Sequence, residues 1–153
     1  MSRATFYGFR LHVHLLAPGL VHRLAVVPAN VSELTVLPDL VADHPGFVLG
    51  DRGFWSPTLQ TQLREQAIIL VTPFRRASSD PAPRFGRWFS RKRYRIETVF
   101  SQLVERFRLR EIRARDPWHL LNRLLRIVLM HTIGVLLNIQ AGRPPLQLAH
   151  LLD

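Results

Sequence analysis

The fold of this chain is decided by one short segment, Phe47-Val48-Leu49-Gly50-Asp51-Arg52-Gly53-Phe54. Its apolar beginning is typical of a buried strand, expected over 46–50, and the glycines around Asp51 indicate that the strand ends there. Ligands of open α/β sheets bind just outside the carboxyl ends of the strands, so an acid at this position is well placed for chemistry. Asp-X-Gly is also a common turn after a strand, and a purely structural role for Asp51 is the alternative.

The sequence ahead of this segment predicts a hairpin and a helix. Residues 5–16 and 20–27 each have the pattern of a strand. The turn signal Pro18-Gly19 between them favours an antiparallel hairpin. Ser32 can cap the helix that follows, but Pro38 is expected to make that helix begin late or kink.

The sequence after Asp51 predicts a helix and a strand, then two long helices. Ser56-Pro57 is typical of a helix start with Ser as the N-cap, and this helix is expected to end near Gln66. The remaining expected elements are a buried strand over 67–72, a loop over 75–86, and helices over 87–108 and 117–140. The residues of the last helix that we expect to face a core are Leu120, Leu121, Leu124, Leu125, Val128, Leu129, Leu136 and Leu137.

Composition bounds the class of protein. The chain has 153 residues, of which 47% are apolar, enough for one domain with a core. It has no cysteine, which excludes disulfides and thiolate metal sites and fits a reducing cytoplasm. The apolar stretch 124–139 holds Arg126 and His131 and is shorter than the roughly 20 residues of a membrane span, so it is expected to be a buried helix with no membrane partner. His131 is expected to be structural, and His12 and His14 are expected at a surface or interface.

Positive charge is concentrated in the second half of the chain. Residues 1–74 are neutral overall, whereas residues 75–153 carry sixteen Lys or Arg against six acids and hold the whole net charge of +10. This uneven distribution favours a polyanionic partner, and a solvated surface is the alternative. Of the 21 basic residues 20 are Arg, whose planar guanidinium donates two hydrogen bonds to one phosphate.

A second acid, Glu97, lies inside the basic helix pattern of 87–108. By itself it has an ordinary interpretation, an exposed acid paired with Arg93 one helical turn earlier. The basic residues on this helix are expected to contact a DNA backbone, unless they are only a solvated helix start. They are Arg91, Lys92, Arg93 and Arg95.

Five segments, taken together and in this order, resemble the DDE-type transposases of bacterial insertion sequences. They are Phe6-Tyr7-Gly8-Phe9-Arg10-Leu11-His12, Pro28-Ala29-Asn30-Val31-Ser32-Glu33, Gly50-Asp51-Arg52-Gly53-Phe54, Val71-Thr72-Pro73 and Arg95-Ile96-Glu97-Thr98-Val99-Phe100-Ser101-Gln102-Leu103. The resemblance covers about residues 4–140. It implies an α/β fold with an RNase H-like mixed sheet flanked by helices and a C-terminal pair of long helices. The implied organisation is one partial catalytic domain over 1–153, with a loop insertion at 75–86 and a tail at 141–153.

The resemblance also implies the chemistry. It makes Asp51 the second and Glu97 the third of three carboxylates that hold Mg²⁺ or Mn²⁺. Two such ions can activate the attacking oxygen and stabilise the leaving one, and Mg²⁺ prefers oxygen ligands. The implied reaction is DNA cleavage at the element ends, followed by attack of the freed 3′ hydroxyl on target DNA. Arg52 is then placed to touch the cleaved strand, with a simple salt bridge as the alternative.

Two departures from the family pattern are expected to matter. The family's first Asp lies on the central strand of the sheet, ahead of the hairpin, whereas this chain begins at Met1, close to the hairpin. Asp39 and Asp43 follow the hairpin and cannot take that role in the same topology. Val104 stands seven residues after Glu97, where the family often has a basic residue. We therefore expect a fragment that lacks the first strand and is inactive in transposition by itself.

The expected function is thus DNA transposition by metal-dependent cleavage and strand transfer. The expected partners are element-end and target DNA and further copies of the transposase, with the Leu-rich last helix as the contact. The expected location is the cytoplasm of a bacterium, at the nucleoid. A non-catalytic DNA-binding remnant that occupies or regulates element ends is the alternative function.

Overall fold

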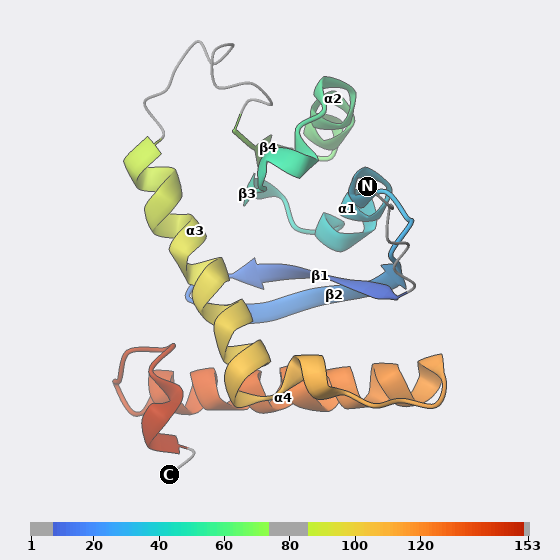
Figure 1. The fold of residues 1–153 in the computed structure, drawn as a ribbon. Helices are drawn as coiled ribbons and strands as arrows, with labels where there is room; N and C mark the ends of the chain where they lie inside the picture. Colours follow the sequence, from blue (N-terminus) through green and yellow to red (C-terminus); the bar gives the residue numbers. More distant parts are fainter. Residues whose placement is uncertain (1–7, 74–85, 152–153) are drawn as a thin grey trace, which may run out of the picture. The chain divides into compact units, whose positions relative to one another are not determined.

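The computed structural model describes residues 8–73 and 86–151, without the side chains of residues 86–90 and 150–151. Its strands and long helices are β1 (Phe9–Leu16), β2 (Leu20–Pro28), α1 (Glu33–Val41), β3 (Gly46–Leu49), α2 (Pro57–Glu65), β4 (Ile68–Val71), α3 (Gly86–Ser101) and α4 (Pro117–Gln140) (Figure 1). The chain divides into two compact units. Unit 1 holds the described residues of Met1–His14 and Arg23–Arg84, and unit 2 holds those of Leu15–His22 and Phe85–Asp153.

The core of unit 1 lies between a small parallel sheet and two helices. β3 pairs with β4 in parallel, with Phe47 opposite Ile69 and Val48 opposite Leu70. Side chains alternate across a strand, so one face of this sheet is buried and the other is not. The buried face packs on α1 and α2 through Leu37, Val41, Val48, Leu59, Leu63, Ile68 and Leu70. The opposite face leaves Phe47 73% exposed.

The expected capping residues behave differently at the first two helices. Ser56 caps α2, because its Oγ accepts a hydrogen bond from the Leu59 N–H at 3.4 Å, as expected. Ser32 precedes α1 but makes no side-chain capping hydrogen bond. Pro38 lies inside α1, which begins at Glu33, so of the two expected effects the late start was wrong and the kink stays a prediction. Four buried residues of α1 hold it in place, which offsets the backbone hydrogen bond that proline cannot make.

Unit 2 is built on α3 and α4. The helix predicted over 87–108 ends as an α-helix at Ser101 and continues as one π-helical turn, Gln102–Arg106. A short 3₁₀ turn at Leu109–Glu111 then leads toward α4, which has the predicted bounds. Buried side chains of this unit include Val99, Leu103, Leu124, Val128, His131, Val135, Asn138 and Leu148.

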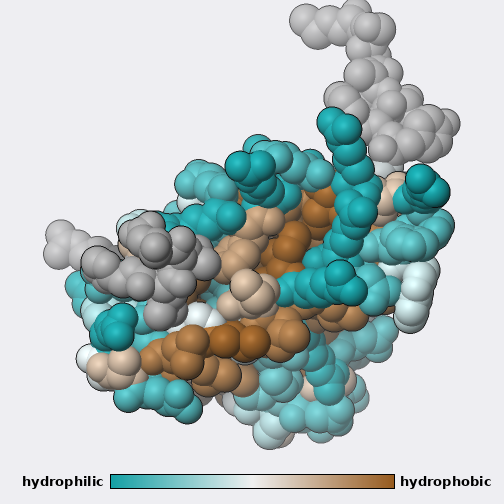
Figure 2. Space-filling view, turned by 90° about the horizontal axis from the view of Figure 1, so that it is seen from below, coloured by the Kyte–Doolittle hydropathy of each residue, from teal (hydrophilic) through white to brown (hydrophobic). Residues whose placement is uncertain are grey.

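The expectation that all the leucines of α4 would face a core was wrong. The buried residues of this helix are Leu124, Val128, His131, Val135 and Asn138, at alternating spacings of four and three. Leu125, Leu129, Leu136 and Leu137 lie on its other faces and are 43–58% exposed. One helix packed on one side buries only one stripe, so the remaining apolar residues stay at the surface. A band of hydrophobic side chains is visible on the face of the molecule seen from below (Figure 2).

Among the described residues, α4 is the single helix long and apolar enough to cross a membrane. This is weak evidence, because core helices of soluble proteins pass the same test of length and composition.

The predicted hairpin is confirmed over its described part, since β1 and β2 pair in one two-stranded sheet. His12 and His14 were expected at a surface or interface, and the surface alternative was wrong, because both are buried. His14 packs edge-on against the ring of His44, with centroids 5.1 Å apart.

The described strands form two separate two-stranded sheets rather than one mixed sheet, because no described strand pairs with both β2 and β3. The predicted loop at 75–86 lies almost wholly outside the described residues.

Replacing Gly19 with Ala is expected to destabilise unit 2 by about 1–3 kcal/mol. Gly19 turns the hairpin with φ +138°, a conformation that L residues rarely adopt, and an added Cβ would lie 2.6 Å from Leu146 Cδ2. The free energy of unfolding, measured by urea denaturation, tests this. Gly142→Ala is the control, because Gly142 also has positive φ but has open space around it. Equal losses in the two variants would show that the contact with Leu146 does not matter.

Candidate active site and nucleic-acid interface

Asp51 lies at the carboxyl end of the parallel sheet, two residues after the last residue of β3. Its Oδ1 accepts a hydrogen bond from the Gly53 N–H at 2.8 Å, and it caps the 3₁₀ turn Arg52–Phe54. The turn role anticipated for this residue is therefore present. The residue is exposed, and Oδ2 has no hydrogen-bond or ion-pair partner among the described residues. One oxygen thus fixes the orientation of the carboxylate while the other faces solvent.

Glu33 is a second acid beside Asp51 that the sequence reasoning missed. A methyl group at Gly53 would lie 2.7 Å from Glu33 Oε2 and 3.1 Å from Asp51 Oδ1, so the two carboxylates flank the same point. Gly53 leaves the space that both acids occupy. Arg10 donates to Glu33 Oε1 at 3.3 Å and balances part of this negative charge. The sequence suggested for Glu33 only a favourable place in the first turn of α1.

Glu97 lies on α3 in unit 2, and it is exposed. Arg93 Nε donates to Glu97 Oε1 at 3.1 Å, and the two side chains are 56% and 60% exposed. This is the ordinary ion pair between residues four apart that the sequence suggested, and such exposed pairs stabilise a helix by only about 0.3–0.5 kcal/mol. The pair holds one oxygen of the carboxylate and orients it on the helix.

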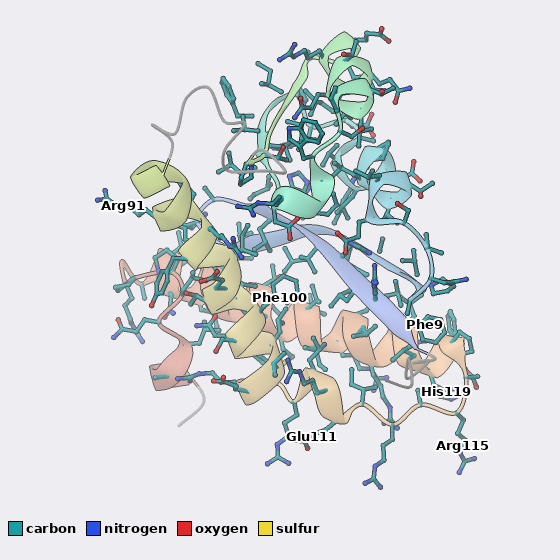
Figure 3. The ribbon with its side chains drawn as sticks, turned by 45° about the horizontal axis from the view of Figure 1, so that its top comes forward. Phe9, Arg91, Phe100, Glu111, Arg115 and His119 are labelled. Atoms are coloured by element: carbon teal, nitrogen blue, oxygen red, sulfur yellow. The ribbon has the colours of Figure 1, made fainter. Side chains whose placement is uncertain are left out.

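Four basic residues expected to bind DNA lie on the same helix as Glu97. Arg91 and Arg95 are exposed and one helical turn apart, and neither has an ion-pair partner among the described residues. Arg91 projects outward from the first turns of α3 (Figure 3). Arg93 is engaged with Glu97, and Lys92 is only partly exposed. Arg91 and Arg95 are therefore the most available cations of this set.

Arg52, the fifth basic candidate, follows Asp51 directly in unit 1. Its side chain is exposed, and no ion pair between it and Asp51 is formed. Its backbone C=O accepts from the Trp55 N–H at 3.2 Å, which closes the 3₁₀ turn. The salt bridge offered as the alternative for Arg52 is thus not present, and its guanidinium is available to an anion.

Buried polar side chains support the helix that carries Glu97. Gln102, in the π-helical turn, accepts from His131 Nε2 at 3.0 Å through Oε1 and donates through Nε2 to the Leu146 C=O. Burial lowers the pKa of His131 below its ordinary value of 6.5, so the ring is neutral near pH 7. These bonds tie the end of α3 to α4, and His131 has the structural role that was expected.

Among the described residues, no three His, Asp or Glu side chains converge as metal ligands. Asp51 belongs to unit 1 and Glu97 belongs to unit 2. Both offer exposed carboxylate oxygens, which are the donors that Mg²⁺ and Mn²⁺ prefer, so their chemistry fits such a metal.

Comparison with protein-family models matches residues 1–117 to the family described as transposase DDE domain. This chain belongs to that family. Searches of curated proteins and of solved structures gave no match. DDE-domain transposases act on DNA and generally use divalent metal ions. The matched residues include Asp51 and Glu97 and end at the first residue of α4.

Proposed function

We propose that this transposase chain supplies Asp51 and Glu97 to a metal-dependent active centre that cleaves DNA and transfers strand ends. One observation carries the proposal. Asp51 stands at the carboxyl edge of a parallel sheet, where its turn fixes one carboxylate oxygen and leaves the other exposed. That is how a fold presents a ligand or substrate group at low entropic cost.

The two acids would hold Mg²⁺ or Mn²⁺ through oxygen atoms. When bound, such ions activate the attacking oxygen and stabilise the leaving one. Asp51 contributes a carboxylate whose rotation is blocked by the Gly53 N–H, and Glu97 contributes one that Arg93 holds. Arg52 is placed beside Asp51 to contact the phosphate under attack.

A third carboxylate completes the centre in our proposal, and in the family's topology it lies ahead of the hairpin. The first acid in this sequence is Glu33, which follows the hairpin, and Asp39 and Asp43 come later still. In this proposal residues 1–153 belong to one catalytic domain. We place this activity in an insertion-sequence transposase that works on DNA in a bacterial cytoplasm, at the nucleoid.

Fe²⁺ in place of Mg²⁺ tests whether the two acids share a metal. With ascorbate and peroxide, bound Fe²⁺ generates hydroxyl radicals that cut the polypeptide near the site. We expect cuts around both residue 51 and residue 97 in the DNA-bound chain. Asp51→Asn and Glu97→Gln should each abolish both sets of cuts. The control variants Asp39→Asn and Glu105→Gln, at exposed positions, should leave both sets in place. Cuts that disappear only at the mutated residue would contradict a shared site.

The alternative function is a non-catalytic DNA-binding remnant. It rests on Arg91 and Arg95, which have no ion-pair partner in the part of the chain that the structure describes. Such a remnant would bind duplex DNA as tightly as the proposed enzyme, but it would show no Fe²⁺-dependent cuts. Asp51→Asn would then change neither property. The same experiment therefore separates the two functions.

We also propose that the chain assembles with copies of itself through α4. The exposed apolar stripe of this helix consists of Trp118, Leu125, Leu129, Ile133 and Leu136. In an antiparallel pair centred near residue 127, Trp118 would lie opposite the partner's Leu136 and Leu125 opposite the partner's Leu129. The stripe is thus complementary to itself, as a two-fold contact requires.

Replacing Leu129 with Glu is expected to convert a dimer into a monomer. Leu129 is 58% exposed, so the charge costs the isolated fold little, but it would be desolvated in the contact. Molar mass by light scattering measures the result, and Tyr94→Glu, at a 68% exposed position on α3, is the control. A wild-type chain that is monomeric, or that sediments with lipid vesicles, would contradict the proposed contact.

A further inference from the structure

Unit 2 contains an open pocket where the connection between α3 and α4 meets the first turns of α4. Its volume is about 320 Å³, which lies within the range of small-molecule sites. The apolar part of its lining comes from Phe107, Ile112 and Ile127. The polar part comes from Arg108, Glu111, Arg123 and Arg126. The pocket therefore combines apolar side chains with four charged ones, which we call its rim.

The positive charge of this rim exceeds its negative charge. Arg108 lies 3.7 Å from Glu111, and both side chains are more than two-thirds exposed, so the pair is weak. Arg123 and Arg126 are exposed and have no ion-pair partner among the described residues. Glu111 lies on the connection itself (Figure 3). Three cations against one acid make the pocket suited to an anion.

The backbone at the rim is strained. Arg108 has φ +53° and ψ +41°, the left-handed conformation, which is uncommon for a residue other than glycine, asparagine or aspartate. This geometry costs about 1–2 kcal/mol, and such strain concentrates at binding sites. It turns the chain between the π-helical turn and the 3₁₀ turn, and it brings Arg108 onto the same rim as Arg123 and Arg126.

We propose that this pocket binds a backbone phosphate of DNA. The guanidinium groups of Arg108, Arg123 and Arg126 hold the phosphate, and the adjoining deoxyribose packs on Phe107 and Ile127. The inference rests on the proposed function for DNA as the ligand but not on the metal chemistry. It extends the DNA contact beyond Arg91 and Arg95 to residues 123 and 126, which lie after the segment matched to the family.

The test compares two double variants of the full chain that lose the same charge. Arg123→Gln with Arg126→Gln alters the pocket, and Arg64→Gln with Arg143→Gln removes two exposed arginines elsewhere. The probe is a fluorescent DNA duplex of about 20 base pairs in EDTA, so that no metal-dependent step contributes. We expect the pocket variant to bind the duplex at least about tenfold more weakly. The slope of its log affinity against log salt concentration should correspond to about one to two fewer phosphate contacts. The control should lose less than about threefold.

A third variant protects the test against misfolding. Glu111→Gln removes the one acid of the rim and is expected to tighten DNA binding by about two- to threefold, a gain that a misfolded chain would not show. Equal losses in both double variants, or no gain with Glu111→Gln, would overturn the proposal. Tighter binding of an RNA duplex of the same sequence would overturn DNA as the ligand. If Fe²⁺ produces no cuts but the variants show the expected DNA affinities, only the proposed metal centre is contradicted.

Discussion

Replacing Asp51 with Asn is expected to leave unit 1 folded while it lowers the Mn²⁺ affinity of the DNA-bound chain at least about tenfold. Asn keeps a side-chain oxygen that can accept from the Gly53 N–H, so the turn after β3 persists. It loses the negative charge and the exposed carboxylate oxygen, which a divalent metal requires. The Mn²⁺ affinity is measured by electron paramagnetic resonance of free Mn²⁺, and folding by urea denaturation.

Asp51→Ala separates the two roles of this residue. It removes the capping oxygen as well as the charge, so it should destabilise unit 1 by about 1 kcal/mol in addition to the loss of metal affinity. Asp39→Asn, at an exposed position of α1, is the matched control for charge. If Asp51→Asn binds Mn²⁺ as tightly as Asp39→Asn does, then Asp51 is a turn residue only.

The second large effect is a loss of stability of unit 2 in acid, caused by His131. The ring is fully buried, its Nε2 donates to Gln102 Oε1, and its Nδ1 has no hydrogen-bond partner. The pKa of this folded-state ring is lowered by burial, so the unfolded chain takes up the proton first as the pH falls. The stability is therefore complete above the unfolded pKa of about 6.5 and decreases below it, with a slope of up to about 1.4 kcal/mol per pH unit.

His131→Gln is the variant that isolates this effect. Gln cannot be protonated in this range, and its amide can still donate to Gln102 Oε1. Urea denaturation at pH 8.0, 6.5 and 5.0, values chosen to span the unperturbed His pKa near 6.5, should show a smaller acid-induced loss in the variant than in the wild type. The two proteins share every other histidine, so the difference between them reports His131. The same pH dependence in both proteins would show that His131 is not the group responsible.

Local signals in the sequence were enough to predict most element bounds. A capping residue followed by proline marked the start of α2, and Ser56 accepts a hydrogen bond from the Leu59 N–H. The structure shows the same arrangement at α4, where Asp116 accepts from the His119 N–H. The hairpin and the strand before Asp51 followed from turn residues and apolar runs. These interactions involve residues close in the chain, so the order of residues alone contains them.

Contacts between residues far apart in the sequence could not be predicted from such local patterns. Nothing near Asp51 in sequence shows that Glu33 lies beside it, because α1 brings that acid back to the edge of the sheet. The π-helical turn also depends on distant contacts, since Gln102 bonds His131 and Leu146. Asp51 as a metal ligand and Glu97 as its partner remain predictions that the proposed experiments test.

The sequence by itself determined the family, the strand that ends at Asp51, the basic character of α3 and the bounds of α4. Only the tertiary structure decided which side of α4 is buried, that His12 and His14 are inside, and that three arginines line one pocket. The physical reason is that capping, turn formation and charge depend on neighbours along the chain. Burial and electrostatic proximity depend instead on what the fold places within a few ångströms, and periodicity alone cannot tell which of two apolar faces will be covered.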